Sequence, residues 1–226
     1  MESGSDLLHA FQSALESASE SIKEKDVVVI ASKAISYSEG LLVKTDDIKG
    51  LVKKEADAVL DEGEMVITMK NKILIPNAGI DNSNTPEGEV ILWPKDPFGS
   101  ARDIREKLKS KFGLNEIGIL ITDSHCQPLR SGTTGIAIGW AGFYGVKDER
   151  GSKDLFGKEM TYTQIAVADD LASAANVLMG ETDASVPFVI VRESPVRFTE
   201  KEFSEDDYFI SPDECIYKGL YNEKLQ

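Results

Sequence analysis

Cysteine and histidine are scarce in this sequence, which has two of each among its 226 residues. Cys126 and Cys215 lie far apart and form no C-x-x-C pair, which excludes both a disulfide framework and a cysteine-based zinc site. Two histidines are also too few for a metal site built on imidazole. We therefore expect any bound metal to be a hard cation with oxygen ligands, meaning Mg, Mn or Ca.

The sequence also lacks an excess of positive charge. Its 25 lysines and arginines face 39 acids, which gives a formal net charge of −14. This balance argues against sequence-independent nucleic-acid binding and against docking on an anionic membrane surface. It does not exclude a phosphate ligand, because an acidic surface can still hold a local basic pocket.

Long apolar runs and an N-terminal signal are missing as well, so we expect a cytoplasmic protein. Hydrophobic residues make up 41% of the chain, enough for a sizeable core in one large domain or two small ones. No internal repeat or low-complexity linker marks a boundary. We predict a single unit over residues 1–226, with two subdomains as an open alternative and no boundary assigned.

Apolar periodicity predicts short strands and helices in irregular order, hence an α+β fold with mainly antiparallel sheets and packed helices. We expect residues 145–163 to be a solvated connection, with a substrate lid as the alternative, and residues 193–226 to be a partly ordered wrap or arm. Helices are expected over residues 5–25 with Ser5 as N-cap, 46–60, 100–111 with Ser100 as N-cap, and 164–180 ending at Gly180; strands are expected over 27–30, 41–43, 65–69, 73–76, 90–93, 117–121, 136–138 and 187–191.

The stretch from Ile117 to Gly142 organises the rest of the chain. A buried strand is expected to stop at Asp123 and Ser124, and an apolar strand resumes at residue 136. Between them lie Arg130 and the small residues 131–135, whose backbone could approach an anion closely. An acid, a hydroxyl, an arginine and a Gly/Thr loop suit a metal and a phosphate. On spacing alone, a polar hairpin with a capped loop is an equally good interpretation.

Three acids, Asp81, Asp123 and Glu181, each follow a regular element and lie among Gly, Ser, Thr or Asn. They could bind divalent cations that neutralise a phosphate, although Asx-rich turns form without any ligand. Lys33 follows a buried strand and could hold a phosphate, but from spacing alone a surface lysine is the better interpretation. The sequence contains no phosphate-binding P-loop and no Rossmann glycine motif, so any nucleotide site must be unusual.

Several longer motifs follow one another over about residues 26–192. They are V-V-V-I-A-S-K-A-I-S, I-P-N-A-G-I-D-N-S-N, I-L-W-P-K-D-P, G-I-L-I-T-D-S-H-C-Q-P-L-R-S-G-T-T-G-I-A-I-G, R-G-S-K-D-L-F-G-K-E-M and V-L-M-G-E. These motifs, in this order, resemble those of the coenzyme F-420:gamma-glutamyl ligase family. Within that family, the chain looks most similar to a shorter bacterial branch described as gamma-glutamate ligases of folate metabolism.

The resemblance implies a role for each matching residue. Lys33 and Arg130 are the implied catalytic residues, acting on anionic groups in the transition state, and the loop 131–135 lies where phosphate or substrate carboxylates are expected. The implied metal ligands are Asp81, Asp123, Ser124 and Glu181. The implied nucleotide contacts are Ser32, Lys33, Asn84 and the loop from Met179 to Val186, including Gly180, Glu181, Thr182 and Asp183.

The chain departs from the family pattern at two places. Family members often carry a nucleotide-contacting lysine where this chain has Tyr37, and they begin with a strand and a proline-containing loop where this chain starts almost at its first helix. Part of the nucleotide site is therefore expected to be absent or supplied otherwise. The choice between GTP and ATP stays open.

The reaction that the resemblance implies is ligation with Mg or Mn and GTP or ATP. A nucleoside triphosphate activates a carboxylate of a folate-like (pterin) or F-420-like (deazaflavin) acceptor as an acyl phosphate, and the amine of L-glutamate displaces the phosphate. The protein's task is positioning and charge neutralisation. The family also implies a homodimer with sites near the subunit contact. The alternatives are a nucleotide- or metal-binding homologue without catalysis and a metal-dependent phosphohydrolase.

Overall fold

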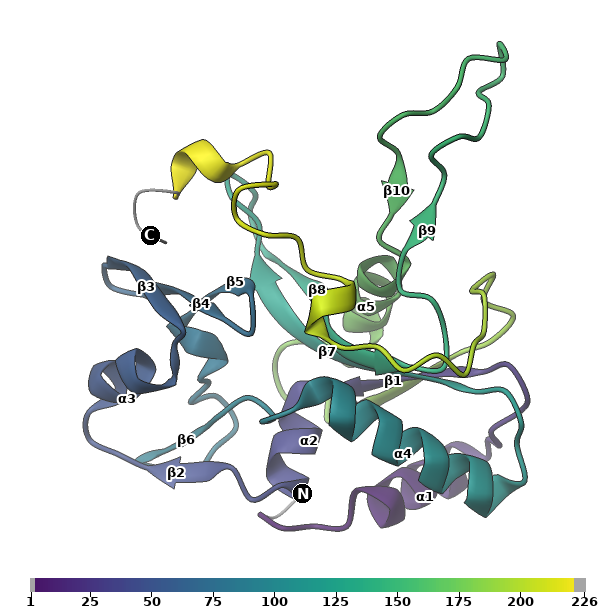
Figure 1. The fold of residues 1–226 in the computed structure, drawn as a ribbon. Coiled ribbons are helices and arrows are strands. Elements are labelled where there is room, and N and C mark those ends of the chain that lie inside the picture. Colours follow the sequence, from purple (N-terminus) through teal and green to yellow (C-terminus); the bar gives the residue numbers. More distant parts are fainter. Residues whose placement is uncertain (1–2, 222–226) are drawn as a thin grey trace.

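The fold was obtained as a computed structural model, in which residues 3–221 are described (Figure 1). Helices and mixed sheets alternate irregularly, which confirms the predicted α+β class. In order, the elements are α1 (Leu7–Ala18), β1 (Val27–Ala31), α2 (Ser32–Ser38), β2 (Leu42–Lys44), α3 (Ile48–Glu55), β3 (Ala58–Glu62), β4 (Val66–Lys70), β5 (Ile73–Pro76), the 3-10 turn η1 (Asn77–Gly79), β6 (Glu89–Ile91), α4 (Pro97–Phe112), β7 (Gly118–Cys126), β8 (Thr133–Ala141), β9 (Lys147–Asp148), β10 (Gln164–Ile165), α5 (Val167–Met179), β11 (Phe188–Val191), η2 (Glu205–Asp207) and η3 (Lys218–Leu220).

The central sheet has the strand order β11-β1-β7-β8, in which β1 and β7 are parallel and the other pairs antiparallel. Successive side chains of β1 point to opposite faces and are buried on both, because helices cover both sides of the sheet. Val28 and Ile30 join the core beneath α1, α2 and α4, whereas Val27 and Val29 join the core beneath α5.

Helix α5 packs closely on β8 because the facing residues are small. Ala168, Ala172 and Ala175 are buried on the helix. Across from them, a side chain on Gly135 would collide with the backbone of Ala172. The many alanines of this helix therefore permit the close approach that fixes its C-terminal end beside the sheet.

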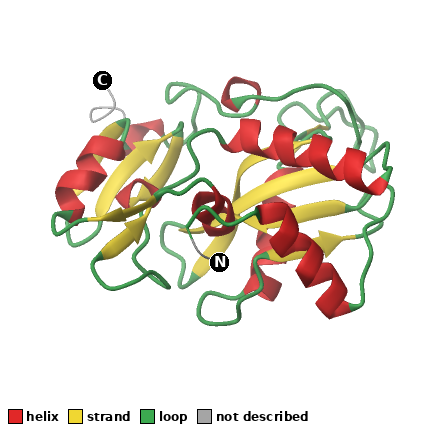
Figure 2. Ribbon diagram, turned by 90° about the horizontal axis from the view of Figure 1, so that it is seen from below, coloured by secondary structure: helices red, strands yellow, loops and turns green. Residues whose placement is uncertain are grey.

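A second group of elements lies at one side of the central sheet (Figures 1 and 2). It contains the three-stranded sheet β3-β4-β5, the pair β2-β6 and helix α3. Its own core is formed by Val52, Val66, Ala78, Ile80 and Val90. This group supplies η1 and the segment after it, which lead directly into one of the predicted site residues, Asp81.

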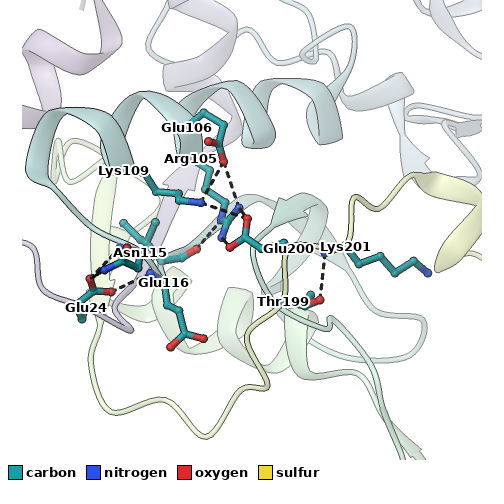
Figure 3. Close-up of polar contacts among 10 residues, drawn as sticks. Glu24, Arg105, Glu106, Lys109, Asn115, Glu116, Thr199, Glu200 and Lys201 are labelled. Carbon is teal, nitrogen blue, oxygen red and sulfur yellow. Dashed lines mark hydrogen bonds and ion pairs between the residues drawn. The ribbon is translucent and has the colours of Figure 1, made fainter.

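Two peripheral segments extend from the body. Strands β9 and β10 form the base of a long arm that projects away from the sheet (Figure 1), and Leu155 and Phe156 on it are almost fully exposed. Residues 193–221 return along the body as a wrap, as predicted, and the last five residues of the predicted wrap or arm, 222–226, lie outside the described residues. Arg105 of α4 holds it by donating to both carboxylate oxygens of Glu200, at 2.8 and 2.6 Å (Figure 3).

Two helices begin at other residues than predicted, because a different side chain caps the N-terminus of each. Helix α1 begins after Asp6, not Ser5, because the Asp6 carboxylate accepts from two backbone N–H groups of the first turn. It ends at Ala18, well before residue 25. Helix α4 begins at Pro97 rather than at Ser100, because Asp96 is its N-cap.

Other differences arise from strand pairing, which sequence periodicity does not reveal. Residues 58–60, expected as the end of the helix over 46–60, instead belong to β3, which pairs with β4. Residues 164–165, expected in the last helix, form β10. Strand β7 does not stop at residue 121 but runs through Asp123 and Ser124 to Cys126, because β8 pairs with it along that length.

No helix in the described part of the chain is long and apolar enough to cross a membrane.

Candidate active site

A cavity of about 510 Å³ opens beside the central sheet. Four segments that are distant in sequence line it: the start of α2, the turn after η1, the middle of β7, and the loop after α5. Their lining residues fall within 31–37, 81–84, 122–124 and 176–187. The cavity is therefore assembled by tertiary structure from all the main parts of the fold.

Parallel pairing of β1 with β7 brings the first two groups of polar residues together. Ala31, the last residue of β1, pairs with Thr122 of β7. The residues that follow each of these two positions, Ser32 on α2 and Asp123 on β7, therefore leave the paired region at the same edge of the sheet. The carboxyl ends of parallel strands are where α/β sheets usually bind ligands.

Asp123 is held by donors on both of its oxygens. The backbone N–H of Ser124 donates to one oxygen at 2.8 Å, and the indole N–H of Trp93 donates to the other. Burial nevertheless raises the pKa of Asp123 to about 6. The Ser124, Trp93 and Ser32 hydrogen bonds oppose this rise, and the nearby carboxylate of Asp81 adds to it.

Asp81 lies opposite, in an ion pair with Lys33. The ammonium nitrogen of Lys33 is 2.7 Å from a carboxylate oxygen of Asp81, and it also donates to the backbone and hydroxyl oxygens of Ser83 at 2.9 and 3.0 Å. Burial alone would raise the pKa of Asp81. The hydrogen bonds from Lys33 and Ser83 outweigh it and lower that pKa below its usual value.

The loop after α5 closes the other side of the cavity. The side-chain amide of Asn84 donates to the backbone oxygen of Thr182 at 2.9 Å, which ties this loop to the turn that carries Asp81. Tyr37 donates its hydroxyl to the backbone oxygen of Asn84 at 3.0 Å. Glu181 accepts from the side chain of Asn176 at 2.8 Å.

Most of the predicted site residues line this one cavity. They are Ser32, Lys33, Asp81, Asn84, Asp123, Ser124, Met179, Gly180, Glu181, Thr182 and Asp183. Arg130 is the exception. It lies with residues 131–132 at the exposed tip of the β7–β8 hairpin and does not line the cavity. The individual roles predicted for all these residues remain predictions.

The acids of the cavity could bind a cation whose remaining ligands come from a bound substrate. Within residues 3–221, no group of three or more His, Cys, Asp or Glu side chains lies close enough together to hold a metal by itself. Asp81 and Asp123, however, are two carboxylates near enough for one to raise the pKa of the other. Mg²⁺ commonly binds through one or two carboxylates, waters and substrate phosphates, and this donor set fits that pattern.

Trp93, which donates to Asp123, and Asn176, which lines the cavity, were not assigned a site role from the sequence. Trp93 was placed only in a strand and a motif, and its bond to Asp123 depends on tertiary structure. Asn176 was taken as part of a helix. Its position one turn before the end of α5 is the only signal that could have placed it at the cavity.

The cavity brings together a lysine, two carboxylates and a polar loop, an arrangement that suits anionic ligands. The comparisons with known proteins show the family to which the chain belongs. A sequence model of the F420-0:Gamma-glutamyl ligase family matches residues 1–193. The chain belongs to this family, and it is accordingly a ligase that forms gamma-glutamyl amide bonds.

Similar curated proteins carry a consistent name. A coenzyme F420:L-glutamate ligase of Methanococcus maripaludis is 36% identical over 215 residues, covering 83% of this chain and 86% of the relative. Proteins of the same name from Methanocaldococcus jannaschii and Archaeoglobus fulgidus are each 37% identical, covering 78% and 75% of this chain and 79% and 76% of their own lengths. The predicted family is thus confirmed, whereas the folate-metabolism branch remains a prediction.

Proposed function

We propose that the protein ligates L-glutamate to a carboxylate of an F420-like acceptor, using GTP or ATP and a divalent metal. The observation that carries this proposal is the meeting of Lys33, Asp81 and Asp123 in one cavity of about 510 Å³. A lysine and two carboxylates are the charges needed to hold a triphosphate together with its cation. The F420-like acceptor is favoured over a folate because the similar curated proteins are named for it.

The chemistry takes two steps. First, a carboxylate oxygen of the acceptor attacks the terminal phosphorus, which gives an acyl phosphate and a nucleoside diphosphate. The neutral amine of glutamate then attacks the acyl carbon, inorganic phosphate leaves with the C–O bonding pair, and the nitrogen loses a proton as the amide forms. Both steps bring anions together, so positioning and charge neutralisation supply most of the acceleration.

The residues of the cavity divide these tasks. Lys33 neutralises the transferred phosphoryl group, while Ser32, Asn84 and the loop of residues 179–183 contact the nucleotide. Asp81, Asp123 and Ser124 would hold Mg or Mn, and Glu181, on the loop after α5, is the fourth proposed ligand. Such a cation, when bound, draws charge from the phosphate oxygens. Arg130 lies exposed at the hairpin tip, outside the cavity lining, and its proposed role is therefore to bind a carboxylate of glutamate or of the acceptor.

We further propose that the protein acts as a homodimer in the cytoplasm. Supporting a partner copy, Leu155, Phe156 and Tyr162 on the arm and Val177 on α5 are large apolar side chains left exposed. Sedimentation at micromolar concentration tests the dimer, and a monomer across that range would contradict it.

The function is tested by mass spectrometry of the product. The protein is incubated with L-glutamate, Mg²⁺ or Mn²⁺, GTP or ATP, and either an F420-type or a folate acceptor. We expect a glutamyl adduct on the F420-type acceptor. Formation only on the folate would reassign the acceptor, whereas nucleotide hydrolysis without any adduct would support a phosphohydrolase.

A further inference from the structure

Trp93 contacts Asp123 and also the segment that leads to Asp81. It follows β6 and exposes only 3% of its surface. On one edge, its indole N–H donates to Asp123. Because the backbone of Ser124 donates to the other oxygen of that carboxylate, both oxygens of Asp123 have fixed donors.

The indole ring also packs on the segment that leads to Asp81. A side chain on Gly79 would collide with the ring of Trp93, so only glycine fits there. Residues 77–79 all have positive φ, of 53°, 53° and 71°. The hydroxyl of Thr68 fixes this turn by accepting from the backbone of Ala78 at 2.8 Å. The ring therefore packs on a turn in which a glycine is required and one hydrogen bond to Thr68 is formed.

Asp81 pairs through its backbone with Ile91, the last residue of β6. The N–H of Asp81 donates to Ile91 at 3.1 Å, and the N–H of Ile91 donates back to Asp81 at 2.8 Å. Trp93 comes two residues after Ile91. One local scaffold therefore carries Asp81 and also the donor that orients Asp123.

We infer that Trp93 is a positioning residue that fixes the Asp123 carboxylate relative to Asp81, so that the two acids bind one divalent cation. This inference rests on the proposed function. Partners that orient a metal ligand commonly change metal affinity by about 10- to 100-fold when they are removed. Trp93 touches neither substrate nor cation and acts through Asp123.

The other tryptophan shows that this bond is not a general requirement for burial. Trp140 is also buried, yet its indole N–H has no partner among the described residues. This fold thus tolerates a buried indole N–H without a partner in the described part of the chain. Burial alone therefore does not explain why the indole of Trp93 donates to a carboxylate of the site. Trp140 therefore provides a matched control.

The substitution must remove the N–H and keep the ring. Trp93 also lines a second cavity, of about 260 Å³, so a small residue at this position would open that space further. Trp93→Phe keeps an aromatic ring against Gly79 and removes the donor. Trp140→Phe makes the same chemical change in the core beneath α5.

The first measurement is the affinity for Mn²⁺, from the electron paramagnetic resonance signal of the free ion, with and without GTP or ATP. We expect Trp93→Phe to weaken Mn²⁺ binding about 10-fold or more and Trp140→Phe to leave it unchanged. Equal affinity in wild type and Trp93→Phe overturns the inference. Absence of Mn²⁺ binding by the wild type instead overturns the metal part of the proposed function, and the inference falls with it.

A second measurement uses tryptophan fluorescence and leaves the indole N–H of Trp93 in place. In Trp140→Phe, the remaining tryptophan, Trp93, gives the fluorescence. Binding of paramagnetic Mn²⁺ should quench it, and further replacement of Asp123→Asn should abolish that quenching. In Trp93→Phe, the emission of Trp140 should change much less. Unquenched Trp93 emission with Mn²⁺ bound would overturn the inference even if Trp93→Phe proved unable to fold.

Discussion

Lys33 forms an ion pair with Asp81 at 2.7 Å, in the cavity where a triphosphate is proposed to bind. A phosphate and a carboxylate would compete for the same ammonium group. Binding of the nucleotide would therefore draw Lys33 toward the phosphate and free Asp81 for the cation that the phosphate brings. Until the ligand binds, the ion pair provides a partner for both the half-buried Asp81 carboxylate and the Lys33 ammonium group.

Replacing Lys33 should thus impair use of the nucleotide more than folding. We expect Lys33→Met to lower kcat/KM for the nucleotide by about 100-fold, because a charge opposite the transferred phosphoryl group is lost. Lys25→Met removes an exposed lysine paired with Glu116 at 3.5 Å and should leave kcat/KM unchanged. Steady-state kinetics with varied nucleotide measures both. Equal loss in the two variants would argue against a role for Lys33 in binding phosphate.

We expect Asp123→Asn to lower kcat by about 100-fold or more while the protein stays folded, because the substitution removes a charged ligand with little change in side-chain volume. Kinetics at several Mg²⁺ concentrations and thermal unfolding measure the two effects. Asp148→Asn, on β9 and outside the cavity, is the control. A variant of Asp123 as active as wild type, with the same metal dependence, would contradict the assignment.

Replacement of Arg130 should weaken the use of glutamate or of the acceptor rather than of the nucleotide. Because it lies outside the cavity lining, we expect Arg130→Ala to raise KM for glutamate or the acceptor by about 10-fold and to leave KM for the nucleotide unchanged. Lys153→Ala, on the arm, removes another exposed cation as a control. If the nucleotide KM rises instead, the hairpin tip reaches the triphosphate in the working enzyme.

The wrap of the C-terminal segment should depend on pH through Glu200. Hydrogen bonds from Arg105 lower the pKa of Glu200 from its usual 4.5 to about 2. The lowered pKa means that this stabilisation is present above pH 4.5 and is lost as pH falls toward 2. We expect Glu200→Gln to reduce the free energy of unfolding by only about 1 kcal/mol at pH 7, since solvent screens an exposed carboxylate.

Denaturant unfolding of wild type and Glu200→Gln at a series of pH values measures this effect. The difference between the two proteins should shrink between pH 4.5 and 2. A difference that stays constant over that range would show that the ion pair with Arg105 does not hold the wrap. Glu202→Gln, a neighbouring exposed acid on the same segment, serves as the control.

The sequence predicted those parts of the fold in which local pattern and tertiary environment agree. Val27–Ile30 is apolar throughout and is buried on both faces of the sheet. Asp123, in contrast, was expected to end a strand because it is polar. Pairing with Ile136 of β8 keeps it in the strand instead. Residues 58–60 were likewise expected in a helix, but they belong to strand β3 because β4 lies beside them.

The site residues, too, could be predicted from the sequence only in part. Spacing alone could not show that Asp81 and Asp123 meet, since two strands and a turn from different parts of the fold bring them together. The family resemblance supplied that expectation. Trp93 could not be found even so, because a tryptophan in an apolar segment is usually a core residue. Only the geometry shows its N–H on Asp123.

The most direct test of the account is the dependence of phosphate release on glutamate. With GTP or ATP, Mg²⁺ or Mn²⁺, and an F420-like acceptor, we expect one phosphate for each labelled glutamate joined to the acceptor. Little phosphate should form when glutamate is omitted, and none above background with Asp123→Asn. Phosphate release at the same rate without glutamate, and without labelled product, would contradict the ligase assignment.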